Sequence, residues 1–442
     1  MKDMSNDIRS ALWSLLVVAF AACSPVPTPK LTPSSSAAPA TIRLPIKTPT
    51  RTSTPAATST PTPMVPTSTT APSLAPISSP IPTFLPFVSA TFRSIRMMDV
   101  KTGWAMADVG AEEATHVLRT ADGGATWRDV SPVDDDLVGS FFLDDQLAWA
   151  WSWYGGSAWR TQDGGLSWTS VGEFGLQPDI GFNDSQHGWK LNAEAWGLSF
   201  VQFDIVSFST TQDGGQTWQD NTPPPDWGTA YMAYPSAQTA WAVRAGFAKT
   251  VEGVPNLGVP FRIQTTFDGG STWTTRQMPL PPEASRVERP HEGTYLGGAG
   301  NCEFISPVYS STAIWKLALT CESRSWMYTT ANQGKTWIIS SMPAGIDVHI
   351  QFINPTIGWL FLGGWLQDYQ GDLYQTIDGG QSWTLIKNTG WGDVRLSFVD
   401  AQTGWAVACN DGYCYERDIE KELVMTTDGG LTWQALEPQL TP

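Results

Sequence analysis

The stretch TADGGATW, residues 120–127, places an acid, two glycines and hydroxyl residues within a few positions, and it returns throughout the chain. The other copies are TQDGGLSW (161–168), TQDGGQTW (211–218), TFDGGSTW (266–273), TANQGKTW (330–337), TIDGGQSW (376–383) and TTDGGLTW (426–433). We call each of these seven copies an octet. Because self-similarity at spacings of a few tens of residues is the signature of repeat architectures, the octets decide the fold.

A second motif, centred on a tryptophan, precedes each octet by a few tens of residues. Short runs typical of β-strands flank the octets, such as HVLRT before the first and WRDV after it. Each octet is therefore predicted to be a hairpin turn between two strands. The second motif reads TGWAMA around Trp104, LAWAWS around Trp149, HGWKLN around Trp189, TAWAVR around Trp241, AIWKLA around Trp315, IGWLFL around Trp359 and TGWAVA around Trp405.

The residue types of the octet favour a structural role. An Asp at a turn entrance accepts backbone N–H hydrogen bonds, the preceding Thr adds an anchor, and the second glycine suits a positive φ. A calcium site needs several convergent oxygens and a phosphate loop needs a Lys after its glycines, whereas each octet supplies one carboxylate at most and only Lys335 comes close. The closing Trp is predicted to enter the core. The structural residues are Asp122, Asp163, Asp213, Asp268, Asn332, Asp378, Asp428, Trp127, Trp168, Trp218, Trp273, Trp337, Trp383 and Trp433.

The octet resembles the Asp-box (BNR) repeat of sialidases, sortilin-type receptors and other β-propellers. Together with the tryptophan motif, the pattern is most similar to the photosystem II stability/assembly factor family, over roughly residues 88–436. The resemblance implies an all-β, seven-bladed β-propeller of four-stranded antiparallel blades, which we assign to residues 85–442. It implies little about activity, because unrelated functions occur on propellers.

Glycan hydrolysis of the sialidase type is the alternative function that the resemblance raises. Sialidases use an arginine triad, a nucleophilic Tyr with a Glu partner and an Asp acid/base on a six-bladed ring, whereas this chain has seven repeats and few arginines. Phe261-Arg262-Ile263-Gln264 partly resembles a sialidase FRIP motif, but it precedes the fourth octet instead of lying near the start. The pattern therefore favours a non-catalytic binding or scaffold module.

The N-terminal residues predict export and a lipid anchor. Lys2 and Arg9 precede an apolar run, 11–22, that is too short to cross a ~30 Å hydrocarbon core and fits a signal peptide over residues 1–22. Its ending FAAC resembles a bacterial lipobox, which implies lipidation of Cys23 and an extracytoplasmic location on a bacterial membrane; a plain secretory signal is the alternative. Residues 23–84 are predicted to be a disordered linker, because they are rich in Pro, Ser and Thr and contain no acid.

The remaining cysteines suit two local disulfides in an exported protein, Cys302 with Cys321 and Cys409 with Cys414, although four buried thiols are the alternative. The chain has a net charge of -16, and residues 85–442 hold 20 basic and 40 acidic residues, a net charge of -20. Such a surface argues against a nucleic-acid partner. It also speaks against binding a photosystem through the basic surface that the assembly-factor resemblance would imply.

The order of the strands within a blade predicts which face of the propeller binds ligands. If the octets join the third and fourth strands of each blade, the opposite face carries the longer connections 191–206, 244–260, 363–371 and 409–417 and the interblade link 276–303. Loops of varying length on a regular scaffold are a common place for function. Aromatic residues and acids on this face suit a sugar or peptide, although ordinary packing between blades is the alternative. The candidates are Trp196, Trp227, Trp365, Tyr369, Trp391 and Tyr413, with Asp226, Asp368, Asp393 and Asp411.

No catalytic, metal-binding or cofactor-binding constellation stands out in the sequence. His116, His187, His291 and His349 fall at unrelated positions of the repeat, and the run 134–136 (Asp-Asp-Asp) is better explained as solvated charge than as a calcium site. We therefore expect a monomeric, lipid-anchored protein whose partner is a protein or glycan at the cell surface.

Overall fold

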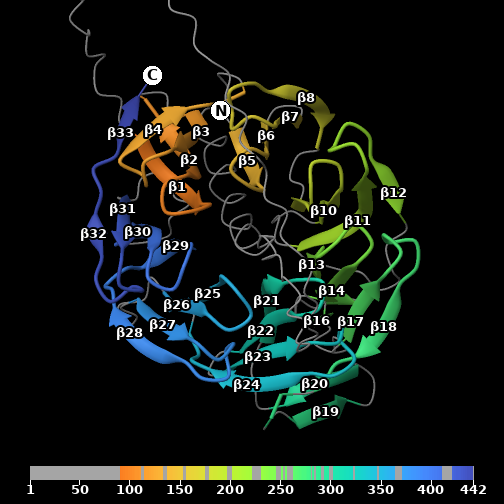
Figure 1. The fold of residues 1–442 in the computed structure, drawn as a ribbon. Helices are drawn as coiled ribbons and strands as arrows, with labels where there is room; N and C mark the ends of the chain where they lie inside the picture. Colours follow the sequence, from red (N-terminus) through yellow and green to blue (C-terminus); the bar gives the residue numbers. More distant parts are fainter. Residues whose placement is uncertain are drawn as a thin grey trace, which may run out of the picture. The chain divides into compact units, whose positions relative to one another are not determined.

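The structure, a computed structural model, describes residues 90–441 apart from 111–113, 133–136, 153–155, 175–178, 197–201, 222–229, 245–249, 252–253, 256–261, 280, 283–284, 290–292, 298–301, 322–323, 346–347, 364–370 and 411–420. The predicted signal segment and linker, residues 1–84, lie outside this range. Within it seven blades, each with four antiparallel strands in chain order, are arranged as a ring (Figure 1). The prediction of a seven-bladed β-propeller is confirmed.

Each blade pairs its four main strands in chain order, and the first strand faces the centre of the ring. Blade 1 contains β1 (Ala90–Met97), β2 (Gly103–Val109), β3 (Ala114–Thr120) and β4 (Thr126–Asp129); blade 2 contains β5 (Leu137–Phe142), β6 (Ala148–Ser152), β7 (Ser157–Thr161) and β8 (Thr169–Glu173); blade 3 contains β9 (Asp179–Phe182), β10 (Gly188–Trp196), β11 (Gln202–Thr211) and β12 (Gln219–Asn221); blade 4 contains β13 (Ala230–Ala233), β14 (Ala240–Arg244), β17 (Arg262–Thr266) and β18 (Thr274–Gln277).

The last three blades follow the same plan. Blade 5 contains β21 (Cys302–Ser310), β22 (Trp315–Cys321), β23 (Arg324–Thr330) and β24 (Ile338–Met342); blade 6 contains β25 (Val348–Phe352), β26 (Gly358–Leu362), β27 (Asp372–Thr376) and β28 (Thr384–Asn388); blade 7 contains β29 (Asp393–Phe398), β30 (Gly404–Cys409), β31 (Lys421–Thr426) and β32 (Gln434–Ala435). Every octet therefore joins the third and fourth strands of a blade, as predicted.

Three of the segments predicted to be long and irregular contain regular structure. The connection predicted over 191–206 is mostly strand, because β10 extends to Trp196 and β11 begins at Gln202. The connection 244–260 includes the hairpin of β15 (Thr250–Val251) and β16 (Val254–Pro255). The link 276–303 includes the hairpin of β19 (Ser285–Arg289) and β20 (Gly293–Gly297).

The ring closes through a strand from the end of the fold. β33 (Gln439–Thr441) pairs in parallel with β4, the outer strand of blade 1, with Leu440 opposite Trp127. Trp405 of blade 7 adds an indole hydrogen bond to the carbonyl oxygen of Gly123 in blade 1, at 2.9 Å. Blade 1 is thus joined to blade 7 by hydrogen bonds from both β33 and Trp405.

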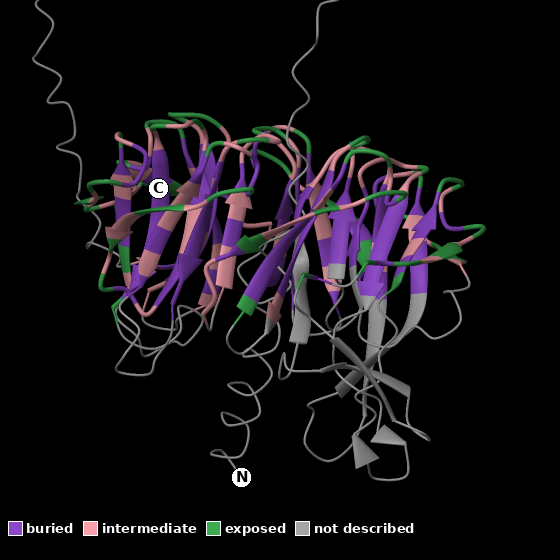
Figure 2. Cartoon of the chain, turned by 90° about the horizontal axis from the view of Figure 1, so that it is seen from below, coloured by how far each residue is buried: buried purple, intermediate pink, exposed green. Residues whose placement is uncertain are grey.

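The core lies between neighbouring blades, on the second strand of each. These strands are apolar without alternation, as in GWLFL of β26 and AWAWS of β6, and every residue of these two strands is buried. A continuous apolar run is expected where a strand is covered on both faces. The fourth strands are mostly exposed, and Figure 2 shows buried residues filling the blades and exposed residues on the turns along the upper edge.

Aromatic stacking joins one blade to the next. Trp149 of blade 2 stacks on Phe182 of blade 3 with ring centroids 3.7 Å apart, and Trp359 of blade 6 stacks on Phe398 of blade 7 at 3.6 Å. The indole N–H groups of both tryptophans also donate to glycine carbonyl oxygens in the next blade, Gly214 and Gly429. The tryptophan motif is therefore the main contact between blades.

The octet tryptophans lie less deeply than the sequence predicted. Trp127 is fully buried, but the other six are only partly covered, whereas the tryptophans of the second motif are 0–1% exposed. Trp127 differs because β33 adds Leu440, and Leu436 packs beside it. The largest share of the core therefore comes from the second motif.

Candidate binding face

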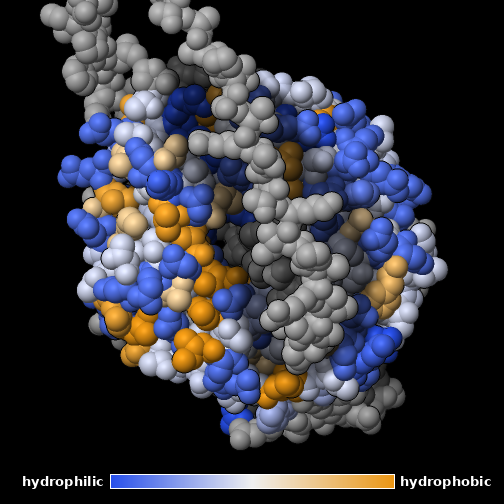
Figure 3. Space-filling view, in the orientation of Figure 1, coloured by the Kyte–Doolittle hydropathy of each residue, from blue (hydrophilic) through white to orange (hydrophobic). Residues whose placement is uncertain are grey.

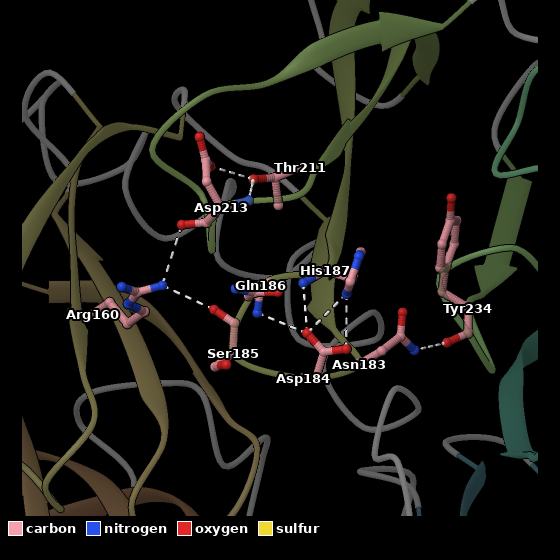
Figure 4. A network of polar contacts seen from close by, with 9 residues as sticks. All are labelled: Arg160, Asn183, Asp184, Ser185, Gln186, His187, Thr211, Asp213 and Tyr234. Carbon is pink, nitrogen blue, oxygen red and sulfur yellow. Dashed lines mark hydrogen bonds and ion pairs between the residues drawn. The ribbon is translucent and has the colours of Figure 1, made fainter.

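Each octet forms a turn held by its own side chains. In the first copy, the Thr120 hydroxyl oxygen accepts a hydrogen bond from the Gly124 N–H at 2.9 Å. Asp122 accepts bonds from the N–H and the hydroxyl of Thr126, at 2.9 and 2.7 Å. The Thr120 hydroxyl also donates to Asp122 Oδ1 at 3.0 Å, and in blade 3 the Thr211 hydroxyl donates to Asp213 Oδ1 at 2.8 Å (Figure 4). The carboxylate is occupied by the turn, which agrees with the structural role predicted for it.

These hydrogen bonds keep the octet carboxylates ionised. Bonds from the Thr432 hydroxyl and N–H lower the pKa of Asp428 to about 2. Burial acts to raise the pKa of Asp378, but bonds from the Ser382 hydroxyl and N–H outweigh it and lower that pKa to about 2. The same bonds lower the pKa of the other octet aspartates, Asp122, Asp163, Asp213 and Asp268.

The octet turns share one face of the ring with the turns between first and second strands. The N–H of Gly123 donates to the carbonyl oxygen of Lys101 in such a turn at 2.7 Å, and Gly379 and Gly429 repeat the contact. Both glycine positions of the first octet have positive φ, 79° and 92°. We call the surface formed by these two sets of turns the octet face.

The octet face is acidic. Among its described turns, the exposed lysines are Lys101 and Lys335. Other cations near it are bonded to backbone carbonyl oxygens of its turns: Arg119 to that of Asp145 at 2.6 Å, Arg160 to those of Ser185 and Asp213 (Figure 4), and buried Lys316 to that of Gly379 at 2.6 Å. The aspartates on these turns are Asp99, Asp122, Asp144, Asp145, Asp163, Asp184, Asp213, Asp268, Asp378, Asp400 and Asp428.

Large apolar side chains protrude from the same turns. Phe267, in the octet of blade 4, is 42% exposed, whereas Ile377, Leu431, Val100 and Leu166 are 74%, 53%, 48% and 71% exposed and occupy the successive blades 6, 7, 1 and 2. Ile377 projects because the side chains on either side of it, Thr376 and Asp378, are bonded to each other inside the turn. We call these four residues the apolar arc. In Figure 3, hydrophobic residues gather on the left, over the elements of blades 6 and 7.

The face predicted for ligands lies largely outside the described residues. This holds for Trp227, Trp365, Tyr369 and Tyr413, with Asp226, Asp368 and Asp411, for the run 134–136, and for the side chain of Trp196 at the end of β10. Trp391 is described, and it is buried, with its ring 5.3 Å from that of Trp433. For Trp391 the expectation of an exposed ligand contact is wrong, and packing inside the protein explains it.

Asp393, expected to be an exposed acid, is buried and paired. Its Oδ1 lies 2.7 Å from His349 Nε2 of blade 6 and 3.0 Å from Arg395 Nη1 of its own strand. The cluster links the inner strands β25 and β29, which position it at the boundary of two blades. Since His349 of one blade and Arg395 of the next contact the same carboxylate, the arrangement is suited to holding the blades together. The relation between His349 and Asp393 could not be read from the sequence, because the two residues are 44 positions apart in different repeats.

Other predicted sites are only partly visible. Cys302 and Cys321 are register partners in β21 and β22, and Cys409 is buried at the end of β30. Cys414 and Cys23 lie outside the described residues, and both disulfides stay predictions. In the described part of the chain, no group of three or more His, Cys, Asp or Glu residues is arranged to hold a metal ion. The same residues include no helix with the length and apolar character needed to cross a membrane.

Aromatic residues that end four of the first strands were not recognised from the sequence: Phe142, Phe182, Phe352 and Phe398. Phe182 and Phe398 stack on tryptophans of the preceding blade and also meet an octet tryptophan of their own blade edge-on, Trp218 and Trp433. The signal was present, because an aromatic precedes the tryptophan motif in most repeats, as in SFVDAQTGW and GFNDSQHGW.

The paired strands and the seven octets define this chain as a β-propeller. No family model and no curated protein matches the sequence. Solved structures of similar fold include YCF48 bound to a D1 peptide (16% identity, TM-score 0.41, 68% of this chain and 80% of that chain). They also include YCF48 from Cyanidioschyzon merolae (13%, 0.43, 78% and 97%) and a GH74 enzyme from Niastella koreensis (13%, 0.25, 78% and 71%). At this level of similarity they add nothing about function.

Proposed function

We propose that this chain is a non-catalytic binding or scaffold protein, held on the outer side of a bacterial membrane by a lipid on Cys23. The observation that carries the proposal is the apolar arc on the octet face. Exposed apolar side chains that gather on one rigid surface mark interaction sites, whereas single ones scattered over a surface need no explanation. The octet and tryptophan motifs, similar to those of photosystem II assembly factors, also favour a scaffold.

The described ionisable groups support binding over catalysis. An enzyme of the glycosidase type needs an acid and a second carboxylate set apart for chemistry. Here the octet aspartates are bonded within their turns, and Asp393 is paired with His349 and Arg395. The buried Asp108 is likewise held by Arg93 at 2.7 Å and by the Thr115 hydroxyl at 2.8 Å. These carboxylates stabilise the scaffold.

The anchor is tested separately from the binding. A lipid on Cys23 places the protein in the membrane fraction of the producing cells, and Cys23→Ser moves it to the soluble extracytoplasmic fraction. Mass spectrometry of the mature N-terminus gives a second measurement. Finding wild-type protein soluble and unmodified would support the plain secretory signal in place of the lipobox.

The binding proposal is tested with peptide and glycan arrays probed with the full chain carrying Cys23→Ser. We expect retention on peptide spots without any product, and weaker retention of the double variant Ile377→Ser/Leu431→Ser. The matched control is Ile338→Ser/Leu385→Ser, which removes apolar residues that are also exposed but lie on fourth strands. Release of product from any glycan would replace the binding proposal with the hydrolase alternative. Absence of binding on both arrays would contradict the binding proposal.

A further inference from the structure

The apolar arc and the acidic turns occupy the same part of the octet face. Between Ile377 and Leu166, blades 6, 7, 1 and 2 carry Asp378, Asp400, Asp428, Asp99, Asp122, Asp144, Asp145 and Asp163, with Lys101 as the exposed lysine of their described turns. Blade 5, by contrast, has Lys335 and no aspartate in its turns. The coincidence of apolar and acidic side chains restricts what chemistry can cover this surface.

Ring closure places the residues of the arc on successive blades. Blade 7 is joined to blade 1 by β33 and by the bond from Trp405 to Gly123, so Leu431 and Val100 lie on adjacent blades although they are far apart in sequence. The turns that carry them are fixed by their own hydrogen bonds, as Asp428 to Thr432 and Asp99 to Thr102 show. A rigid surface of this kind binds without a large cost of ordering its own side chains.

The aspartates around the apolar arc stay negatively charged under physiological conditions. The octet carboxylates accept two or more hydrogen bonds each, and the pKa of Asp99 is also lowered, by bonds from the N–H groups of Lys101 and Thr102 that outweigh its burial. Arg119 lies close enough to Asp99, Asp144 and Asp145 to interact with their charges, so a partner that covers the remaining carboxylates must bring positive charge or leave them uncompensated.

Charge complementarity excludes two other occupants. A second copy of this face would oppose like charges, which is costly across an interface. A membrane surface containing anionic lipids would be repelled in the same way. A polypeptide with both basic and apolar side chains satisfies the carboxylates and covers the arc at the same time.

From this geometry, and resting on the proposed binding function, we infer that the apolar arc docks a cationic amphipathic segment of a partner protein. The apolar face of the segment lies on Ile377, Leu431, Val100 and Leu166, and its lysines or arginines meet the surrounding aspartates. This makes the octet face a binding surface in addition to holding the repeat together.

The inference is tested by fluorescence anisotropy with three synthetic helical peptides and the full chain carrying Cys23→Ser. The peptides share one pattern and contain leucine with lysine, leucine with glutamate, or serine with lysine. We expect binding of the leucine–lysine peptide alone, weakening as salt increases because the charges are exposed. Ile377→Ser/Leu431→Ser should raise its Kd at least about tenfold, since two side chains lose their burial.

Two further variants separate charge from apolar contact. Asp400→Asn/Asp99→Asn keeps an oxygen that can accept the bonds within each turn, and it should weaken binding severalfold and reduce the salt dependence. Ile338→Ser/Leu385→Ser should leave the Kd unchanged. Circular dichroism of every variant verifies that the fold is retained.

Equal binding of the leucine–glutamate or serine–lysine peptide would overturn the inference, as would an unchanged Kd in Ile377→Ser/Leu431→Ser. Self-association in the ultracentrifuge or binding to anionic vesicles that this variant abolishes would assign the arc to another occupant and also overturn it. These outcomes differ from those that would contradict the proposed binding function, which are absence of binding on the peptide array or turnover of a glycan.

Discussion

Phe398 shows how single residues connect the two repeated motifs. It stacks on Trp359 of the preceding blade at an interplanar angle of 5°, and the ring of Trp433 meets it at 77°. Offset-stacked and edge-on aromatic pairs each add to the free energy gained from burial. Phe398 is 3% exposed, so the tryptophan motif of blade 6 and the octet of blade 7 are packed against the same ring.

Replacing Phe398 by Ala should lower the free energy of unfolding by about 3–5 kcal/mol, because it removes a buried ring and leaves a cavity between two indoles. Urea denaturation followed by tryptophan fluorescence measures the change. Phe267→Ala is the matched control: this ring is 42% exposed, and its loss should change stability by no more than about 0.5 kcal/mol. Similar effects of the two variants would contradict the connecting role of Phe398.

Asp428 should make stability depend on pH. Its pKa of about 2 in the folded protein lies below its ordinary value of 3.8, so the ionised carboxylate stabilises the fold above pH 3.8, and this contribution disappears as the pH falls through 2. Asp428→Asn should therefore be less stable than wild type at pH 6, with a difference that shrinks toward pH 2. Urea midpoints across this range measure it.

The fifth octet supplies the control for that experiment. Asn332 replaces the aspartate and keeps the turn, since its Oδ1 accepts the Thr336 N–H at 2.9 Å and its Nδ2 donates to the Thr336 hydroxyl at 2.8 Å. Asn332→Asp should introduce a new pH dependence of the same sign. If neither variant alters the slope of stability against pH, the octet carboxylates do not contribute as described.

At the scale of elements, the octet turn tolerates one departure from its usual sequence. Gln333 occupies the position that is the first glycine in the other copies, and it has a φ of 60°. This left-handed conformation costs a non-glycine residue about 1–2 kcal/mol. The turn nevertheless forms, because the bonds of Thr330 and Asn332 and the following glycine are retained.

Gln333→Gly should raise the free energy of unfolding by about 0.5–1 kcal/mol, since relief of backbone strain exceeds the added entropy of the unfolded chain. The reverse comparison is Gly379→Ala at the same position of blade 6, where φ is 80° and a Cβ atom would lie 2.9 Å from the carbonyl oxygen of Pro355. That variant should be destabilised. Thermal unfolding measures both, and equal signs would refute the conformational explanation.

The turns could be predicted from sequence because their determinants are local. Thr, Asp and Gly within one octet make nearly all of its bonds, and hence the strands on either side were placed correctly. The partners of Asp393 and Trp391 depend on which blades meet and on which connections cover them, and this information is spread over distant repeats. The length of the β10–β11 hairpin was missed although β10 (GWKLNAEAW) alternates apolar and polar residues, a pattern that indicates a half-exposed strand.

At the scale of the whole molecule, the number of blades follows from counting octets, but the closure of the ring does not. Nothing in the sequence of β33 distinguishes it from a terminal tail, and its partner β4 is already paired with β3 in the hairpin of its own blade. Likewise the apolar arc joins residues of blades 6, 7, 1 and 2, and it can be recognised only when the ring is closed. From the sequence, ligands are accordingly expected on the opposite face.

Leu440→Ser should weaken the closure of the ring. Leu440 lies opposite Trp127 and packs in the same core cluster, so its replacement should lower the free energy of unfolding by about 1–3 kcal/mol. Trp127 should also become accessible to acrylamide, a quencher of indole fluorescence. Gln439→Ser, a change at an exposed neighbour, is the control, and equal effects would show that β33 does not cover the core.

Pairing of β33 with β4 also means that the ring closes after the blades have been synthesised. Thr441 and the carbonyl oxygen of Trp127 that it contacts are separated by 314 positions, so the ribosome makes the strand that closes the ring only after it has made the seven blades. Until then the growing chain is an open row of sheets with Trp127 unprotected. The ring can therefore close only once residues 439–441 have been made, and closure is a late event in the life of the chain.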